Sequence, residues 1–598
     1  MDLLAQLRRR FDYPTGFDDA RRTLAQFHTV LVDGDPGNGR SAAARILLFE
    51  YRDLRSTLRE VAAEDDEGDV RLDTRTHDEP EGLLLDLSDA DLDTWHALHD
   101  DLPGLHHSVR TSRSRLVVVL PARLPASALH PDLARLRAVI SRPDARLVLR
   151  GAFLDAGFEG VRELPEDVEH FLGRIPPLQQ VVRLAWLVRT EAAAGRSPRF
   201  ADWCRAAVEV LTRRPEDVAR HVVGLKGGRP RALLLATAML HGARSDAVYE
   251  ACEALLATVE HPADERPLLD REDLSARFTE IKATHDRQGR VTFAETDYDI
   301  AIRTHFWNHM PGLRAQLATW VGRAVALDSL APTDRALLAE RFTEQTLRTS
   351  GPHHLLGLVR KWADHTDPRV RPAAAHALAY GSLHPEHGRA FRRELLMWGT
   401  SSLSAARAEV LTAACSGEFA SRFPEQAMVR LHHVARHPRY GGEAERRLID
   451  LVVGDHRLHR RMLERLARGL AKALSTDVRL FTVLASPRHL TVLRTGTQAR
   501  PHALLDERGV RAGLIDCWAA LFGNVPLAEW HDLPHQWFAA AGHVAPHRRD
   551  QLLDILVSGC RGQPLHLARL YQLAFHHRVA PLLRHKVDAA QGLRSSRP

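Results

Sequence analysis

Lysine, cysteine and long apolar runs are all scarce in this 598-residue chain. Only five of its 82 basic residues are lysines, so almost every positive charge is a guanidinium group. The five cysteines are widely spaced and form no C-x-x-C pair, which excludes a disulfide framework and favours reduced thiols in a cytoplasmic protein. Because no run of about 18 apolar residues occurs, and the first residues lack the apolar core of a signal peptide, we expect neither a membrane span nor a leader.

The composition is that of a folded chain with several domains. Hydrophobic residues make up 44% and charged residues 26% of the sequence. Because a single hydrophobic core rarely serves a chain of this length, we expect two to four domains. The net charge of +6 is small for this length and gives only weak support to nucleic-acid binding. No G-x-S-x-G, H-E-x-x-H or Cys/His nucleophile pattern is present, and no histidine pair has the further ligands that a metal site needs.

The strongest chemical pattern lies in residues 28–51. A short apolar run at residues 29–32 predicts a buried strand, a glycine-rich turn follows at 34–41, and the residues after it have helical spacing. Strand, glycine loop and helix are the context that the phosphate-binding pattern G-x-x-x-x-G-K-[ST] requires. Gly34 and Gly39 hold its glycine positions and Ser41 its hydroxyl position. The sequence therefore predicts a phosphate-binding loop.

Such a loop binds phosphate mainly through main-chain amides. Glycines allow positive φ angles and a close approach to an anion, and successive N–H groups then form an anion nest. The helix that follows adds the positive end of its dipole. We assign Gly34, Gly37, Asn38 and Gly39 to phosphate contacts and Ser41 to a Mg²⁺ that bridges two phosphates.

Arg40 stands where the pattern has a lysine. Arginine is longer, planar and forked, so it binds phosphate strongly but pairs with it differently. Because phosphoryl transfer depends mainly on positioning, we expect binding to survive this change better than hydrolysis. Three interpretations stay open at this point: nucleotide binding, which we favour, a loop that has lost nucleotide or takes another anion, and a chance match.

A second predicted strand, residues 83–87, carries the candidate acid. Asp86 follows three leucines and so ends an apolar strand. In P-loop folds, an acid at the end of such a strand beside the loop holds Mg²⁺ through water. We therefore assign Asp86 a catalytic and a metal-binding role. Leu87 occupies the place of the usual water-activating base, so only Asp89 or Asp91 could substitute, and hydrolysis should be weak or absent. The alternative is an ordinary strand end with a surface aspartate.

Further segments continue the alternation of strands and helices. Such alternation implies a parallel sheet with both faces covered, and ligands bind at the carboxyl ends of its strands. Arg123 and Arg150 fall near such ends and are candidates for a γ-phosphate, although each is equally plausible as a surface arginine. The expected elements are helices at residues 93–108 and 131–140 and strands at residues 115–120 and 145–150.

From residue 164 onward the apolar spacing is helical, so we expect a multidomain and mainly α protein. One hairpin is predicted near residues 286–293, and the helices before it suggest a winged-helix-like unit. Residues 367–379 resemble a HEAT helix, and an array of such helices presents a surface for a protein partner or ligand. The expected domains are N-terminal helices 1–27, a P-loop α/β domain 28–163, a helical lid 164–228, a winged-helix-like domain 229–320 and a helical array 321–598.

These parts together resemble the STAND class of signal-transducing P-loop ATPases, which are related to AAA+ proteins. Gly228-Arg229-Pro230 resembles the G-x-P motif with which the lid of that family touches nucleotide, and the stretch from Tyr298 to Arg314 is similar to STAND-like proteins of actinomycetes. The resemblance covers roughly residues 28–320. It implies binding of ATP or ADP with Mg²⁺, roles for Gly228 and Pro230 at the nucleotide, an ADP-held closed form and an ATP-bound form that oligomerises.

Three functions therefore compete. The first is a nucleotide-controlled switch whose C-terminal helices sense an unidentified partner, with weak ATP hydrolysis or none. The second is an interaction scaffold with a vestigial P-loop, and the third is a DNA-binding regulator that uses the winged helix. Lys226, Arg229 and Arg231 form the only basic cluster at the start of that unit, and its expected wing places Asp286 beside Arg287, so DNA binding is not favoured.

Overall fold

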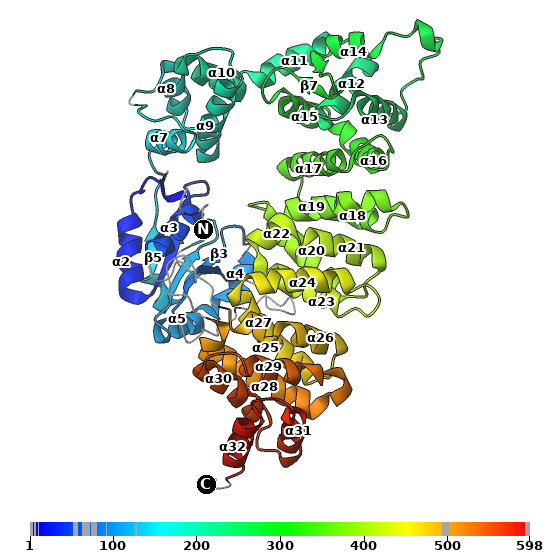
Figure 1. Ribbon diagram of the computed structural model, residues 1–598. Coiled ribbons are helices and arrows are strands. Elements are labelled where there is room, and N and C mark those ends of the chain that lie inside the picture. Colours follow the sequence, from blue (N-terminus) through cyan, green and yellow to red (C-terminus); the bar gives the residue numbers. More distant parts are fainter. Residues whose placement is uncertain are drawn as a thin grey trace. The chain divides into compact units, whose positions relative to one another are not determined.

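The structure is a computed structural model that describes residues 4, 7–9, 11–51, 58–61, 72, 80–90, 92–122, 124–125, 128–161, 163–492 and 503–592. The described chain is mainly helical and forms two compact units, Met1–Glu394 and Leu395–Pro598 (Figure 1). We refer to them as the first and the second unit. Across the described residues, no helix is long and apolar enough to cross a membrane.

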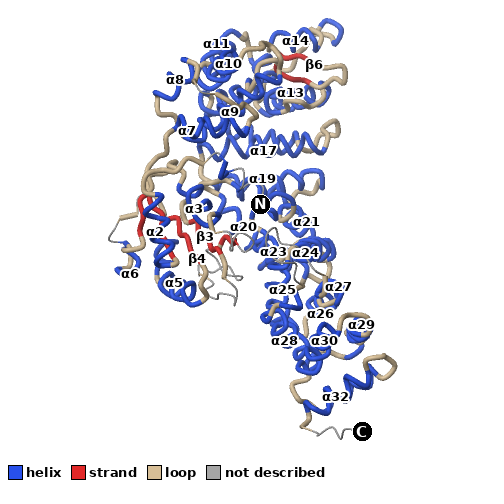
Figure 2. Tube along the Cα trace, turned by 60° about the vertical axis from the view of Figure 1, so that its left-hand side comes forward, coloured by secondary structure: helices blue, strands red, loops and turns tan. Residues whose placement is uncertain are grey.

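A parallel sheet of five strands lies in the first unit (Figure 2). The strand order is β2-β3-β4-β1-β5, and every neighbouring pair is parallel. In the register of the sheet, Val32 of β1 pairs with Val119 of β4, which pairs in turn with Asp86 of β3. The strands are β1 (Thr29–Asp33), β2 (Leu58–Glu60), β3 (Gly82–Asp86), β4 (Arg115–Val119) and β5 (Arg137–Val139). The predicted strands at 29–32, 83–87 and 115–120 are thus confirmed.

Helices cover both faces of the sheet, which explains why its central strands are almost continuously apolar. Val30 and Val32 of β1 pack against α2 (Phe17–Phe27) and α3 (Arg40–Phe49) on one face. Leu31 points to the other face, where it belongs to the core formed with α4 (Leu92–His99) and α5 (Leu102–Thr111). The period-2 alternation of side chains along a strand places these neighbours in two separate cores.

Three local predictions in this region are wrong. The single helix expected at 93–108 is two helices, because α5 begins anew with Pro103 in its first turn. The helix expected at 131–140 is only α6 (Pro131–Ala134), and β5 follows it. The strand expected at 145–150 is the start of helix α7 (Ala145–Asp155).

Helix α7 shows why the last of these predictions failed. A short apolar run does not distinguish a strand from a buried helix. Asp144 caps the helix by accepting a 2.8 Å hydrogen bond from the amide of Arg146. Leu149, Ala152 and Phe153 are buried at helical spacing in one core with α8–α10. Arg150 therefore lies within a helix and not at the carboxyl end of a strand.

Helices make up most of the rest of the first unit. The predicted hairpin is confirmed: β6 and β7 pair antiparallel, with His285 opposite Val291. The elements are α8 (Glu166–Gly173), α9 (Leu178–Ala193), α10 (Phe200–Thr212), α11 (Arg214–Gly224), α12 (Gly228–Met239), α13 (Ser245–Thr258), η3 (Leu268–Asp270), α14 (Leu274–Glu280), β6 (Ala283–His285), β7 (Val291–Phe293), α15 (Tyr298–His309), η4 (Pro311–Leu313), α16 (Arg314–Ala324), α17 (Pro332–Thr349), α18 (Pro352–Ala363), η5 (Pro368–Val370) and α19 (Arg371–Leu383), with α20 (Gly388–Thr400) at the unit boundary.

The second unit consists of helices that pack on others close to them along the chain, such as α23 on α24, α24 on α25, and α28 on α30. Its described part contains no strand, as expected. The elements are α21 (Ala405–Ala414), α22 (Gly417–Arg422), α23 (Pro424–Ala435), α24 (Gly442–Gly454), α25 (His456–Leu470), α26 (Ser475–Leu484), α27 (Pro487–Leu490), η6 (Leu504–Asp506), α28 (Arg508–Asn524), η7 (Leu527–Glu529), α29 (Asp532–Ala541), α30 (Pro546–Gly559), α31 (Pro564–Ala574) and α32 (Ala580–Ala590).

A buried polar cluster joins three helices inside the second unit. The Nε2 atom of His432 in α23 lies 3.0 Å from Oδ1 of Asp477 in α26, and both side chains are fully buried. Arg436 donates to both oxygens of Asp477, at 3.0 and 2.6 Å. The Nε atom of Arg465 in α25 donates to Nδ1 of His432 at 3.3 Å. Since Nδ1 accepts a hydrogen bond, the proton of this neutral imidazole is on Nε2.

Candidate phosphate-binding site

The glycine-rich loop lies at the carboxyl end of β1 and leads directly into α3. Gly34, Gly37 and Gly39 have φ angles of 144°, 84° and 81°, which side-chain-bearing residues rarely adopt. A Cβ on Gly34 would lie only 2.3 Å from the carbonyl oxygen of Ile140, so glycine is required there for close packing as well. Space is open around the Cβ positions of Gly37 and Gly39. The loop is therefore bent as predicted and accessible from outside.

The main-chain amides of this loop are available to an anion. One turn is closed internally by a 3.2 Å hydrogen bond from the amide of Asn38 to the carbonyl of Asp35. Among the described residues, the amides of Gly37, Gly39, Arg40 and Ser41 form no main-chain hydrogen bond. The last of these amides belong to the first turn of α3, where the helix dipole also favours negative charge.

The sheet topology places this loop at a switch point. From β1 the chain continues to β2, β3 and β4 on one side, and only after β4 does it reach β5 on the other side of β1. Connections that leave in opposite directions open a crevice at the carboxyl ends of the strands, where ligands of open α/β sheets bind. The loop at 34–41 occupies the end of the strand at which this reversal occurs.

Arg40 is buried beneath the loop and does not extend into solvent. Only 5% of the residue is exposed, and its Nη1 atom donates a 2.8 Å hydrogen bond to the carbonyl of Leu120, just after β4. Burial lowers the pKa of the Arg40 guanidinium, while the carboxylates of Asp33, Asp86 and Asp35 oppose this shift. The positive charge of Arg40 is thus held at the strand ends among three acids. One of its five N–H donors is used by Leu120.

Asp33 holds the loop in place through contacts that the sequence analysis did not identify. Its Oδ1 atom accepts a 2.7 Å hydrogen bond from the amide of Gly34, and its Oδ2 atom accepts a 2.7 Å bond from Nε of Arg137 in β5. Asp33 therefore fixes the entry of the loop and ties it to the edge strand. An acid directly after an apolar run could have drawn attention to Asp33. Its partner Arg137 could not be recognised, because the segment around Arg137 was wrongly expected to be helical.

Asp86 lies at the end of β3 as predicted, but both of its carboxylate oxygens have partners. Oδ1 accepts a 3.2 Å hydrogen bond from the amide of Ser88, and Oδ2 lies 3.7 Å from the guanidinium of Arg45. Arg45 also lies 3.6 Å from Glu60 and donates to the carbonyl of Ser41 at 3.3 Å. The sequence analysis missed Arg45, although it follows Ser41 by four residues and so shares its helix face.

The donor set does not fit the expected Mg²⁺. Mg²⁺ is held through oxygen atoms, and the carboxylate of Asp86 that would supply them already faces the positive charges of Arg40 and Arg45, which would repel the ion. In the described part of the chain, no group of three or more histidines, cysteines or acids is placed to hold a metal ion. Ser41 remains half-buried in the first turn of α3, next to Arg45.

The other predicted site residues do not join this cluster. Arg123 lies outside the described residues. Gly228 and Pro230 form the first turn of α12. The imidazole of His261 packs against Gly228 there, and Arg229 donates a 2.9 Å hydrogen bond to the carbonyl of Pro262. Arg229 also lies 3.9 Å from Glu253, so this turn contacts both α13 and the segment that follows it.

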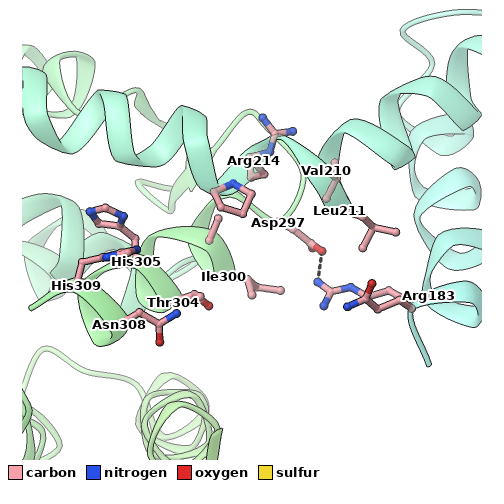
Figure 3. A pocket seen from close by; sticks show the side chains of 13 residues that line it. Arg183, Val210, Leu211, Arg214, Asp297, Ile300, Thr304, His305, Asn308 and His309 are labelled. Carbon is pink, nitrogen blue, oxygen red and sulfur yellow. Dashed lines mark hydrogen bonds and ion pairs between the residues drawn. The ribbon is translucent and has the colours of Figure 1, made fainter. Parts of the chain in front are cut away.

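A separate pocket of about 230 Å³ lies among helices α9, α10, α11 and α15 (Figure 3). Arg183 points across it to Asp297, with which it forms an ion pair. Arg214 pairs with Glu295, so both guanidinium groups at the pocket are neutralised. The lining residues are Gln180, Arg183, Val210, Leu211, Arg214, Pro215, Asp297, Ile300, Ala301, Thr304, His305, Asn308 and His309. The glycine loop, with its open amides, therefore remains the better candidate for an anion.

No protein-family model matches this chain, and no curated protein matches it.

Proposed function

We propose that this protein is a nucleotide-binding regulatory switch of the STAND type, which holds the phosphates of ATP or ADP in the loop at residues 34–41. One observation carries this proposal: the bend contains three glycines with positive φ, and four main-chain amides in and directly after it form no main-chain hydrogen bond. Such a bend, followed directly by a helix, is an anion nest of the kind used by P-loop proteins. Its place at the switch point of a parallel sheet gives independent support.

Binding is expected to outweigh hydrolysis in this protein. Hydrolysis of a P-loop nucleotide needs an acid that positions or activates water near the γ-phosphate. Asp86 is engaged by Ser88 and Arg45, and Leu87 next to it is buried and apolar. A switch that binds nucleotide and hydrolyses it slowly or not at all is consistent with these contacts.

The helical parts would act as the moving and sensing elements of the switch. We assign residues 164–228 to a lid and residues 229–320 to a winged-helix-like unit, which in the resembled class close over bound nucleotide. Helices α12–α14 followed by the β6–β7 hairpin are consistent with that assignment. The successive helices after residue 320 would form a repeat-like array that binds a protein partner and so biases closure. Self-association through the nucleotide-bound form follows from the same proposal.

DNA binding through the winged helix receives no support from the surface of α14. Arg277 is the only basic residue of this helix, and its guanidinium lies 5.8 Å from the ring of Tyr249. The residues exposed around it include Glu272, Asp273 and Glu280. Since phosphate contacts from Lys and Arg dominate DNA affinity, these acidic neighbours do not favour it. Tight, salt-dependent binding to duplex DNA would nevertheless revive that function.

Calorimetric titration of ADP and of ATP into the full-length chain tests the proposal. Wild type should bind at one site, and Arg40→Ala should weaken binding about tenfold or more, because a charge-assisted hydrogen bond is worth about 1.5–3 kcal/mol. Arg110→Ala is the matched control: Arg110 is exposed near the end of α5, just before β4 begins, and thus near the amino ends of the strands, opposite the ends that carry the loop. Absence of binding to wild type would leave only the scaffold function.

A further inference from the structure

We infer that the loop binds its phosphate anion without a divalent metal ion, and that Arg45 supplies the positive charge which Mg²⁺ provides in other P-loops. This inference rests on the proposed function, because it concerns the same site. It departs from the Mg²⁺ requirement expected from the sequence. The contacts of Asp86 and the position of Arg45 on α3 are the observations that carry it.

The first observation is that the carboxylate needed by the metal is already occupied. The Oδ2 atom of Asp86 lies 3.7 Å from Nη2 of Arg45, and Oδ1 accepts a 3.2 Å hydrogen bond from the amide of Ser88. The side chain of Asp86 is only 12% exposed and that of Arg45 17%, so solvent screens this pair weakly. Because the expected contact runs through water, the water molecules of a metal ion would have to compete with this guanidinium for Oδ2 before Asp86 could hold the ion.

The second observation is the place of Arg45 beside the loop. Arg45 follows Ser41 by one helical turn and donates a 3.3 Å hydrogen bond to its carbonyl oxygen. The hydroxyl of Ser41 and the carboxylate of Asp86 are the two protein groups that hold Mg²⁺ in a P-loop, and Arg45 contacts both residues. A guanidinium at this location can neutralise an anion in the loop and donate hydrogen bonds to it.

The third observation is the charge balance around the loop. Arg40, Arg45 and Arg137 are held by Asp33, Asp86 and Glu60 through the contacts described above. Asp35, which is exposed in the loop, adds one negative charge to these three pairs, so the open amides and not a net positive charge provide the attraction for phosphate. Adding a dication would place it next to the guanidinium groups of the buried Arg40 and the partly buried Arg45, whose repulsion it would have to overcome. An anion held by the amides without its metal avoids this repulsion.

Titration of ADP and of ATP into wild type, once with Mg²⁺ and once with excess EDTA, tests the inference. We expect the same dissociation constant in both buffers. Nucleotide binding that occurs only with Mg²⁺ would overturn the inference and leave the proposed function intact. Absence of binding in both buffers would instead overturn the proposed function itself, so the two failures are distinguishable.

Variants at Arg45 test whether its guanidinium is the group that allows ADP to bind without metal. Arg45→Ala should bind ADP about tenfold more weakly in EDTA, and Mg²⁺ should restore most of this loss because Asp86 is then free to act as a ligand. Arg45→Ala/Asp86→Asn should show the same loss without rescue by Mg²⁺. Arg45→Lys keeps a charge and should bind at an intermediate level in EDTA. Melting curves confirm that each variant folds.

Two results at this position would contradict the role of Arg45. Wild-type affinity for ADP in Arg45→Ala with EDTA would show that its charge is not used. Rescue by Mg²⁺ in the Arg45→Ala/Asp86→Asn variant would show that the metal is held elsewhere. Arg110→Ala, which removes an equal charge near the amino ends of the strands, should behave as wild type in both buffers.

Discussion

The guanidinium of Arg40 donates a 2.8 Å hydrogen bond to the carbonyl oxygen of Leu120, which directly follows β4. The amide of Leu120 in turn donates a 3.0 Å hydrogen bond to the carbonyl of Val32 in β1. Arg40 therefore ties the loop that follows β1 to the neighbouring strand as well as bringing positive charge to it. A lysine has one terminal donor group and a shorter reach, so it could not both anchor the loop to β4 and bring positive charge to the loop as arginine does.

Loss of the Arg40 anchor should destabilise the sheet. Arg40→Ala leaves the carbonyl of Leu120 without its partner and removes a buried charge that faces Asp33 and Asp86. We expect the free energy for local opening of β1 and β4 to fall by about 2–4 kcal/mol. Hydrogen exchange of the amides in β1 and β4 measures it. The exposed Arg110→Ala should leave this exchange unchanged, and equal protection in Arg40→Ala would contradict the anchoring role.

Substitutions at two loop glycines should differ in their cost. Gly34→Ala places a Cβ 2.3 Å from the carbonyl oxygen of Ile140 at a φ angle of 144°. Gly37→Ala meets open space and suffers only from its φ angle of 84°. We expect Gly37→Ala to cost about 1–2 kcal/mol and Gly34→Ala clearly more. Melting temperatures of the full chain provide the comparison, and equal melting temperatures for the two variants would show that the contact with Ile140 is not tight.

The hydroxyl of Ser41 should matter little for nucleotide affinity. In a P-loop with bound Mg²⁺ this hydroxyl is a metal ligand, whereas here Arg45 takes the place of the metal. Ser41→Ala should therefore weaken ADP binding less than about threefold, since a single neutral hydrogen bond is worth roughly 1 kcal/mol or less. The titration compares Ser41→Ala with wild type in EDTA. A loss of the size expected for Arg40→Ala would contradict a binding mode without metal.

The buried imidazole of His432 should make the second unit sensitive to acid. Burial lowers the pKa of His432 to about 4, and a proton on Nδ1 would face the Nε–H of Arg465. Because the unfolded chain protonates a histidine near its ordinary pKa of about 6.5, stability is complete above that pH and decreases as the pH falls toward 4. The loss should reach about 3 kcal/mol.

Denaturation of wild type and His432→Gln across this pH range measures the effect. The pH dependence of the second unit should largely disappear in His432→Gln, because glutamine does not titrate. His543→Gln changes an exposed histidine of the same unit and should keep the wild-type profile. Asp477 should contribute little above pH 4: burial raises its pKa, but the hydrogen bonds from His432 and Arg436 hold that pKa below the ordinary value. A flat wild-type profile would contradict the account.

The central strands could be predicted from the sequence, while the edge strands could not. β1, β3 and β4 are apolar runs of strand length that are buried on both faces, so composition alone marks them. β2 is Leu-Arg-Glu and β5 is Arg-Ala-Val, and segments of three residues with polar members carry no periodic signal. Their strand geometry is set by pairing with β3 and β1, which is a tertiary contact.

The loop could also be predicted, but not its electrostatic surroundings. Glycine spacing within the chain specifies the bend at residues 34–41. The partners of Asp86 and Asp33, by contrast, are Arg45 on α3 and Arg137 on β5. These pairs form only when the helix packs on the sheet and the edge strand joins β1. No local pattern specifies them, which is why the Mg²⁺ expectation and the contacts of the structure differ.

Hydrogen exchange of the peptide that covers residues 34–41, measured with and without ADP in the presence of EDTA, tests the central claim most directly. If the open amides of this loop hold the phosphates, ADP should slow their exchange, and Arg110→Ala should show the same protection as wild type. Unchanged exchange of this peptide at saturating ADP, or protection confined to other parts of the chain, would contradict it.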